Sequence, residues 1–445
     1  MFKFPENLYT DVRIEHVFET NIVYTLGKLE QLKTRKTNGA FIRVFDGSMW
    51  YYSSISDADD VQKEIDRLAG LAKPNANINE NPIIEKFQAN KGKFLNYEED
   101  DISKISKDEK INLLKSLFPN ITSRNTIKMW TATYVDNRTE KEFYSSKGAN
   151  LVFDSQRTGI ALSMRFAEND KNFSDSFQKG GSKFSQIKNQ EIPLEIFIDK
   201  CEYFLRNAQP IEEGKYTVIL SPLAAGVFAH ESFGHKSEAD FMVGDETMKR
   251  EWAIGTKVGS GILSIADSGL EPGSGFVPYD DEGTKAETTY LIENGFLKGR
   301  LHSSSTAADL QEAITGNARA INFEYEPIVR MTTTYILPGK KTKEQLFEEV
   351  SDGVFIETIK HGSGMSTFTI APSLAYRIRN GKIAEPVKVS VISGTVFNTL
   401  AEIDGLSNKL ELLSFIRGGC GKMEQFPLPV GFGGPYVRVK SMNVQ

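Results

Sequence analysis

The residues best suited to chemistry in this sequence are gathered in the segment His230-Glu231-Ser232-Phe233-Gly234-His235. Imidazole nitrogens bind divalent transition metals, and a carboxylate beside them can take a proton from a water on that metal. The segment therefore predicts a metal centre with His230 and His235 as ligands and Glu231 as the general base. This arrangement is typical of a metallopeptidase.

The spacing of the two histidines sets a condition on the backbone. Residues five apart lie about 140° apart around a regular α-helix, so the two rings would not converge. A π-bulge or an early end of the helix would bring them together, and Gly234 gives the backbone the freedom to do so. We therefore expect a local distortion between His230 and His235.

Two histidines leave a catalytic zinc site one protein donor short, because such sites normally have three protein ligands and one open position. Cys420 is the best candidate for the third. It lies in Arg417-Gly418-Gly419-Cys420-Gly421-Lys422, where the glycines leave the backbone free to approach a neighbouring helix closely and expose the sulfur. A metal or Lys422 would favour the thiolate, and a mixed imidazole and thiolate set suits Zn²⁺.

The secondary-structure elements that must position this segment can also be predicted from the sequence. Residues 215–220 are predicted to form a buried strand, after which Ser221 can cap a helix and Pro222 suits its first position. A helix is therefore expected over residues 223–233, with the histidines at its end. His16, His302 and His361 lack ligand spacing, and we predict that they are structural or solvent-exposed.

The rest of the chain predicts an α+β protein, with an N-terminal mixed sheet-and-helix domain (1–210) and a β-rich C-terminal catalytic domain (211–445). Asn294-Gly295 and Asn380-Gly381 indicate hairpins in the second half. In the first half we expect a hairpin over residues 40–52, followed by a helix that Ser56 and Asp59 cap and that buries Val61, Ile65 and Leu68. A second hairpin over 127–145 is expected to turn at Asn137-Arg138, and separate strands are expected at 151–153 and 160–166. Gly180-Gly181 is predicted to be flexible, and a helix from Pro193 is predicted to bury Cys201.

Composition excludes several classes of protein. The formal net charge is -6, without the basic excess that binding of a phosphate backbone requires, so no direct nucleic-acid partner is expected. No apolar run approaches the length of a membrane span. The chain has two cysteines and its first residues lack a secretory pattern, which favours the cytoplasm. The acidic run Asp280-Asp281-Glu282 is interpreted as a solvated turn without the spaced donors of a second metal site.

A family resemblance adds to these observations. The matching segments are residues 230–240 and the runs Asp280-Asp281-Glu282-Gly283-Thr284, Leu291-Ile292-Glu293-Asn294-Gly295, Thr315-Gly316-Asn317, Arg330-Met331-Thr332, Leu337-Pro338-Gly339 and Gly419-Cys420-Gly421-Lys422. In order and spacing they resemble the TldD/TldE (PmbA) family, in particular its metal-bearing TldD type.

This resemblance implies a zinc-dependent peptidase that acts on small or unstructured peptides. It implies one Zn²⁺ per active subunit, held by the residues that match here as His230, His235 and Cys420, with Glu231 as the base. It also implies a dimer, either of two identical chains or with a TldE-type subunit that lacks the metal motif.

Two other functions stay open at this point. Cys420 can be the nucleophile of a cysteine-dependent hydrolase with a histidine as its base. The chain can also be a non-catalytic peptide-binding subunit, which the presence of all three donors and the carboxylate disfavours. A chelator separates a zinc enzyme from a thiol enzyme.

Overall fold

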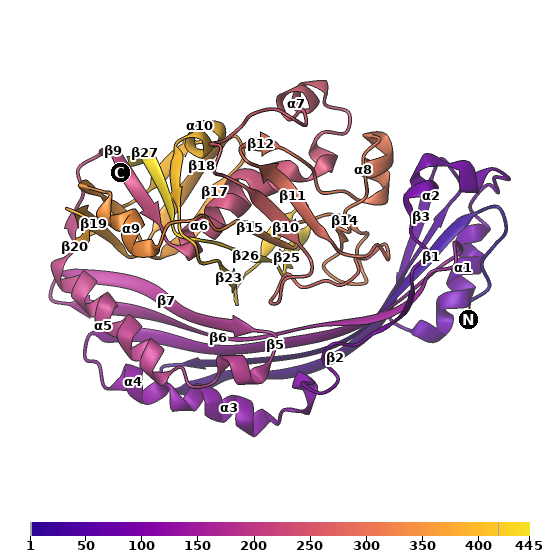
Figure 1. Cartoon of the computed structure of the whole chain (residues 1–445). Helices are drawn as coiled ribbons and strands as arrows, with labels where there is room; N and C mark the ends of the chain where they lie inside the picture. The colour runs from indigo at the N-terminus through magenta and orange to yellow at the C-terminus, as the bar shows by residue number, and fades with distance from the viewer. Residues whose placement is uncertain (1, 417) are drawn as a thin grey trace.

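The computed structural model describes residues 2–416 and 418–445 and shows an α+β protein, which confirms the predicted fold class. A long, curved sheet from the N-terminal half runs beneath a strand-rich C-terminal half, and a smaller group of helices and strands lies at one end of that sheet (Figure 1). Across the described residues, no helix is both long and apolar enough to cross a bilayer.

The N-terminal half is built around a seven-stranded sheet with the order β3-β2-β1-β5-β6-β4, in which β7 also pairs with β6. Its strands are β1 (Tyr9–Thr25), β2 (Lys28–Phe45), β3 (Trp50–Ile55), β4 (Lys91–Phe94), β5 (Ile127–Ser145), β6 (Asn150–Glu168) and β7 (Lys171–Gly181). Its α-helices are α1 (Val61–Ala69), α2 (Pro82–Lys86), α3 (Lys107–Ser116), α4 (Phe118–Thr122) and α5 (Glu191–Asn207). The predicted boundary after residue 210 falls between α5 and β9 (Gly214–Leu220), and the division into two domains stays a prediction.

The predicted turn at Asn137-Arg138 is wrong, because β5 runs without interruption through both residues. Asn137 pairs with Glu19 of β1 on one side and with Arg157 of β6 on the other. Pairing on both edges satisfies the backbone and outweighs a local turn preference. The same long pairing makes residues 150–168 one strand, β6, in place of two, and extends β7 through Gly180-Gly181.

The helices of the N-terminal half follow the predicted hydrophobic patterns. Val61, Ile65 and Leu68 form the buried face of α1, as expected. The cap differs, because Asp57 accepts from the Asp59 amide and opens a short 3-10 turn ahead of the helix. Cys201 on α5 is fully buried, which confirms its place in the core.

The C-terminal half is built around a ten-stranded sheet and a six-stranded sheet. Its strands are β8 (Gln209–Pro210), β9 (Gly214–Leu220), β10 (Ile265–Ser268), β11 (Thr288–Glu293), β12 (Phe296–Leu297), β13 (Ala318–Arg319), β14 (Ile328–Val329), β15 (Thr333–Ile336), β16 (Asp352–Ile356), β17 (Ile359–Gly364), β18 (Thr367–Pro372), β19 (Ala375–Arg379), β20 (Lys382–Lys388), β21 (Ile392–Thr395), β22 (Ile403–Leu406), β23 (Glu411–Ser414), β24 (Cys420–Lys422), β25 (Gln425–Leu428), β26 (Gly431–Gly434) and β27 (Val437–Val444). Its α-helices are α6 (Pro222–Ala229), α7 (Glu246–Glu251), α8 (Ser304–Asp309), α9 (Lys343–Glu348) and α10 (Val396–Ala401). Both predicted hairpin turns are confirmed, since Asn294-Gly295 and Asn380-Gly381 have positive φ angles and join paired strands.

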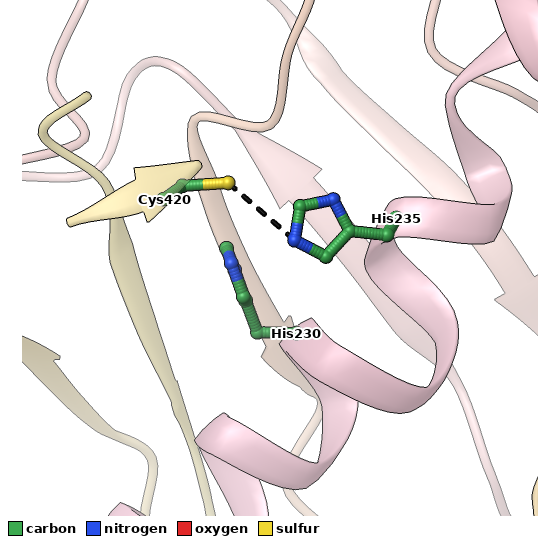
Figure 2. A group of neighbouring side chains, drawn as sticks. All are labelled: His230, His235 and Cys420. Carbon is green, nitrogen blue, oxygen red and sulfur yellow. Dashed lines mark hydrogen bonds between the residues drawn. The ribbon is translucent and has the colours of Figure 1, made fainter. Parts of the chain in front are cut away.

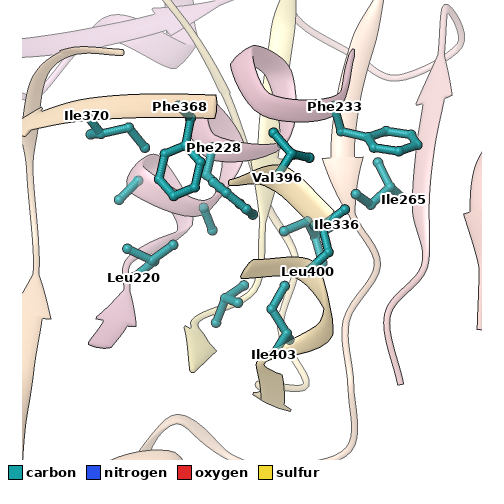
Figure 3. Packing of buried hydrophobic residues seen from close by; sticks show 14 of the residues in the cluster. Leu220, Phe228, Phe233, Ile265, Ile336, Phe368, Ile370, Val396, Leu400 and Ile403 are labelled. Atoms are coloured by element: carbon teal, nitrogen blue, oxygen red, sulfur yellow. The ribbon is translucent and has the colours of Figure 1, made fainter. Parts of the chain in front are cut away.

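The core of the C-terminal half surrounds α6 and the turn that follows it (Figure 3). Phe228 and Phe233 are fully buried. Their ring centroids lie 4.9 Å from those of Phe368 and Trp252, respectively. Burial of each such ring stabilises the fold by about 2 to 3 kcal/mol, so the segment that carries the histidines is fixed on both sides.

Buried charges join the two halves, and they correct the interpretation of Asp280-Asp281-Glu282 as a solvated turn. All three carboxylates are buried. Lys141 of β5 pairs with Asp281, and Arg43 of β2 donates to Glu282 at 3.0 Å. Although burial opposes ionisation, the Lys141 ammonium lowers the pKa of Asp281. The run is a contact between the halves because the cations that neutralise it come from strands that are distant in sequence.

A half-buried carboxyl at the contact between the halves gives a pH prediction. Asp175 of β7 accepts from Thr358 at 3.0 Å, and burial raises its pKa from 3.8 to about 6. The folded state therefore binds this proton more tightly than the unfolded state, so stability from this group falls as pH rises from about 4 to 6. We expect Asp175→Asn to stabilise the chain by about 1 to 3 kcal/mol at pH 7 and to have little effect at pH 4.

The measurement is urea unfolding of the wild type and the variant across this pH range. Asp170→Asn, at an exposed position in the adjoining turn, is the matched control. If Asp175→Asn lowers the free energy of unfolding by the same amount at pH 7 and at pH 4, ionisation of Asp175 does not destabilise the folded chain, and the prediction is wrong.

Candidate metal centre

Helix α6 begins directly after strand β9 and leads into the histidine segment at its C-terminal end. The Ser221 hydroxyl accepts from the Ala224 amide at 3.2 Å and Pro222 occupies the first turn, as the sequence predicts. A Cβ on Gly226 would lie 2.6 Å from the Gly433 amide nitrogen, so only glycine lets α6 pack this closely on β26. The end of α6 is therefore held directly against the six-stranded sheet.

The backbone distortion predicted between the histidines is present. Residues His230–Gly234 form a π-helical turn in which the His235 amide donates to the His230 carbonyl. A Cβ on Gly234 would lie 2.1 Å from Met331 Sδ, so the turn needs glycine at this position. The turn brings the two imidazole centroids to 5.1 Å, with the rings at 76° to each other.

Cys420 reaches the same place from strand β24, which pairs with β25. Its side chain is 4% exposed, and its Sγ lies 3.5 Å from His235 Nε2 (Figure 2). The Arg330 guanidinium donates to the Cys420 carbonyl at 2.7 Å and fixes the strand from behind. A Cβ on Gly419 would lie 2.5 Å from the Leu428 carbonyl oxygen, which accounts for the glycine beside the cysteine.

The three side chains have the spacing of a metal-binding set. One potential ligand atom from each of His230, His235 and Cys420 lies within 4.8 Å of the others. A tetrahedral zinc with ordinary bond lengths places nitrogen and sulfur about 3.6 Å apart, close to the 3.5 Å between Cys420 and His235. His230 Nδ1 is buried without a hydrogen-bond partner among the described residues, and a buried polar atom of this kind normally binds a ligand or water. These donors therefore fit a zinc ion.

The electrostatics of the cluster favour the thiolate. Burial opposes ionisation of Cys420, but His230 and His235 lower its pKa to about 5. Burial likewise opposes protonation of His235, whereas its contacts with Cys420 and Glu238 raise its pKa to about 10. An anionic sulfur beside two imidazoles is the form of cysteine that binds metals.

Two charged residues support this set in a way that the sequence does not predict: Lys422 was expected only to favour the Cys420 thiolate, and Glu238 was given no role. Glu238 is completely buried, and its Oε2 lies 3.4 Å from His235 Nδ1. Lys422 Nζ lies 3.0 Å from Glu238 Oε2 and 2.7 Å from Asp240 Oδ1. The one available signal was their position, three residues after His235 and two after Cys420.

Glu231 lies outside the donor set and beside strand β17. Its side chain is half-buried. A Cβ on Gly362 would lie 3.3 Å from Glu231 Cγ, and one on Gly364 would lie 2.9 Å from the Glu231 carbonyl oxygen. The two glycines therefore let β17 pass directly alongside the backbone and the side-chain stem of Glu231. In the described ranges β17 pairs only with β18, so its other edge is free.

The remaining histidines lie outside this donor set, as expected. His302 is buried, and its Nε2 lies 2.9 Å from Glu312 Oε2. His16 contacts Glu142 at the N-terminal sheet, and His361 is exposed on β17. None of them joins the metal-binding set found among the described residues.

With this geometry established, comparison with known proteins gives the class of protein. Residues 213–445 match the PmbA/TldA metallopeptidase C-terminal domain, residues 100–205 the central domain and residues 10–73 domain 1 of the same metallopeptidases. The class is therefore metallopeptidase, as predicted. The chain belongs to the PmbA/TldD family, which confirms the resemblance found in its motifs.

Relatives and solved structures agree with this assignment. A metalloprotease of Methanocaldococcus jannaschii is 31% identical, with 97% of this chain and 95% of the relative covered. A zinc metalloprotease TldD homologue of Saccharolobus solfataricus is 28% identical over 98% of this chain and 96% of the relative. The crystal structure of TldE from Thermococcus kodakarensis superimposes with a TM-score of 0.80 at 16% identity, covering 98% of this chain and 96% of that one.

Proposed function

We propose that this chain is a zinc-dependent peptidase that cleaves small or unstructured peptides. In this proposal His230, His235 and Cys420 hold one Zn²⁺, and Glu231 is the general base. The observation that carries it is the convergence of the three donor atoms within 4.8 Å, from a π-turn and from a strand 185 residues downstream. Three protein ligands leave one vertex free for substrate or water, as catalytic zinc sites require.

Zinc bound here would polarise a peptide carbonyl and make water a stronger acid. The protein's own contribution is the placement of Glu231, which follows His230 directly and yet lies outside the donor set. Its carboxylate accepts the proton of the attacking water and passes it to the nitrogen of the departing amine. The Gly362 and Gly364 backbone beside Glu231 limits how far that side chain can move.

The free edge of β17 supports an extended peptide as the substrate. A peptide that pairs with an open edge gains main-chain hydrogen bonds whatever its side chains are, so it must be unfolded locally but needs no particular sequence. Strand β17 passes Glu231 through Gly362 and Gly364. A folded protein cannot offer its backbone in this way, which accounts for the proposed preference for small or unstructured peptides.

One observation favours the cysteine hydrolase as a second candidate. The lowered pKa of Cys420 and its 3.5 Å contact with His235 also describe a thiolate and imidazolium pair. However, Cys420 is 4% exposed and faces two histidines, whereas a nucleophile needs only one base and an open approach. The zinc enzyme therefore accounts for more of the geometry.

Metal removal separates the two candidates. We expect incubation with a chelator to lower hydrolysis of an unstructured, fluorescently labelled peptide at least about tenfold, and added Zn²⁺ to restore it. The control is the same chain passed through the procedure without chelator. A cysteine hydrolase would keep its activity through metal removal, and that result would reject the zinc mechanism.

The proposed partner is a second copy of this chain or a TldE-type subunit. The shared fold with TldE over nearly the whole chain supports a pair of similarly shaped subunits. We place the enzyme in the cytoplasm, since both cysteines are unpaired, which suits a reducing compartment.

A further inference from the structure

Glu238 is a buried carboxylate that the proposed chemistry does not use. Its side chain is completely inaccessible to solvent, and its Oε2 lies 3.4 Å from His235 Nδ1. A buried carboxylate is costly unless cations or donors neutralise it, so a position of this kind calls for an explanation.

The contact between Glu238 and His235 bears on which ring nitrogen faces the donor set. A neutral imidazole has one N–H and one lone pair, and the partner of the first nitrogen decides which nitrogen keeps the lone pair. A carboxylate beside Nδ1 holds the proton there. His235 Nε2, the nitrogen 3.5 Å from Cys420 Sγ, is then the nitrogen that gives up its proton and offers a lone pair when a metal binds.

Lys422 connects this carboxylate to the segment that carries Cys420. Its Nζ lies 3.0 Å from Glu238 Oε2 and 2.7 Å from Asp240 Oδ1. The same ammonium donates to the Val329 carbonyl at 3.0 Å. The ammonium neutralises the buried Glu238 carboxylate and compensates for the water that this carboxylate loses on burial. Because Lys422 is two residues from Cys420, the same contact holds strand β24 against the histidine segment.

From these contacts we propose that Glu238 is a positioning residue for the metal centre, with Lys422 as its counter-ion. Glu238 holds the Nδ1 proton and the orientation of the His235 ring, and Lys422 ties the Cys420 strand to it, so that His235 Nε2 and Cys420 Sγ are in position before a metal arrives. This inference rests on the proposed function, since it concerns the affinity of the same site for zinc.

The test measures zinc affinity of the full chain by competition with a chromophoric chelator. Removal of a carboxylate that supports a ligating histidine typically weakens metal binding 10- to 100-fold. We expect about that loss for Glu238→Ala. Glu238→Gln, which keeps an oxygen acceptor but no charge, should lose at least about threefold.

A second imidazole and carboxylate pair in the same half of the chain provides the matched control. Glu312 contacts the buried His302 at 2.9 Å, away from the donor set. Glu312→Gln removes a comparable contact, so its zinc affinity is expected to equal that of the wild type within about twofold. Circular dichroism and thermal unfolding of the metal-free chains show whether each variant is folded.

The outcomes are separable. A wild type that binds no zinc would overturn the proposed function and this inference with it. A wild type that binds zinc, with Glu238→Ala equal to it, would overturn the inference alone, as would an equal loss in Glu312→Gln. If Glu238→Ala does not fold, Glu238→Gln decides: a loss in affinity supports the positioning role, and wild-type affinity rejects it.

Discussion

Glu231→Gln is expected to lower the turnover of an unstructured peptide by about 10²- to 10⁴-fold while the chain keeps its zinc. Glutamine has nearly the same size, so β17 and the π-turn should stay in place, but an amide cannot accept a proton at neutral pH. Since Glu231 lies outside the donor set, the metal should be unaffected. The measurement is kcat together with zinc content for the wild type and the variant.

The matched control is Glu246→Gln on α7, where the carboxylate side chain is 81% exposed and pairs with Lys249. It should leave kcat within about twofold, as surface changes usually do. If Glu231→Gln hydrolysed peptides as fast as the wild type, Glu231 would not be the base. If the variant lost activity and zinc together, the carboxylate would act by holding the metal.

Cys420→Ala is expected to weaken zinc binding on the order of a hundredfold or more, because the site would fall from three protein donors to two. Peptide hydrolysis should fall with the metal. Cys201→Ala is the control, since this second cysteine is fully buried on α5 in the core of the N-terminal half. It should reduce stability through the lost packing and leave zinc affinity unchanged.

Unchanged zinc affinity in Cys420→Ala would exclude the sulfur as a ligand. If that variant kept zinc and lost all hydrolysis, the cysteine hydrolase would regain support. The two cysteines thus separate an effect on the metal centre from a general effect of removing a thiol.

Much of the candidate centre could be predicted because its rules are local. Ser221 and Pro222 predict where α6 begins, and the five-residue spacing of His230 and His235 predicts a distortion that the π-turn supplies. The glycine neighbours of Cys420 point to this residue, but Gly419 packs against Leu428 of strand β25 and not against a helix, and Cys420 is buried where exposure was expected.

The failures came where distant segments decide the outcome. Asn137 and Arg138 have a turn preference, but strands on both sides hold them in β5. Asp280-Asp281-Glu282 is an ordinary turn sequence, and cations of the N-terminal sheet, among them Lys141 and Arg43, explain its burial. No local pattern contains that information, because those cations lie far away in the sequence.

The contact that supports the centre could not be predicted for the same reason. The sequence suggests only that Lys422 favours the Cys420 thiolate, whereas the fold brings its ammonium to 3.0 Å from Glu238. Their contact links segments that are more than 180 residues apart, so its role depends on the tertiary structure alone.

The metal content of the purified wild-type chain tests the central claim most directly. Elemental analysis after purification without chelators, or after loading with zinc and desalting, should find close to one zinc per chain. The His230→Ala, His235→Ala double variant, prepared in parallel, should carry almost none. A wild type without zinc after loading, or a double variant that binds as much as the wild type, would contradict the account.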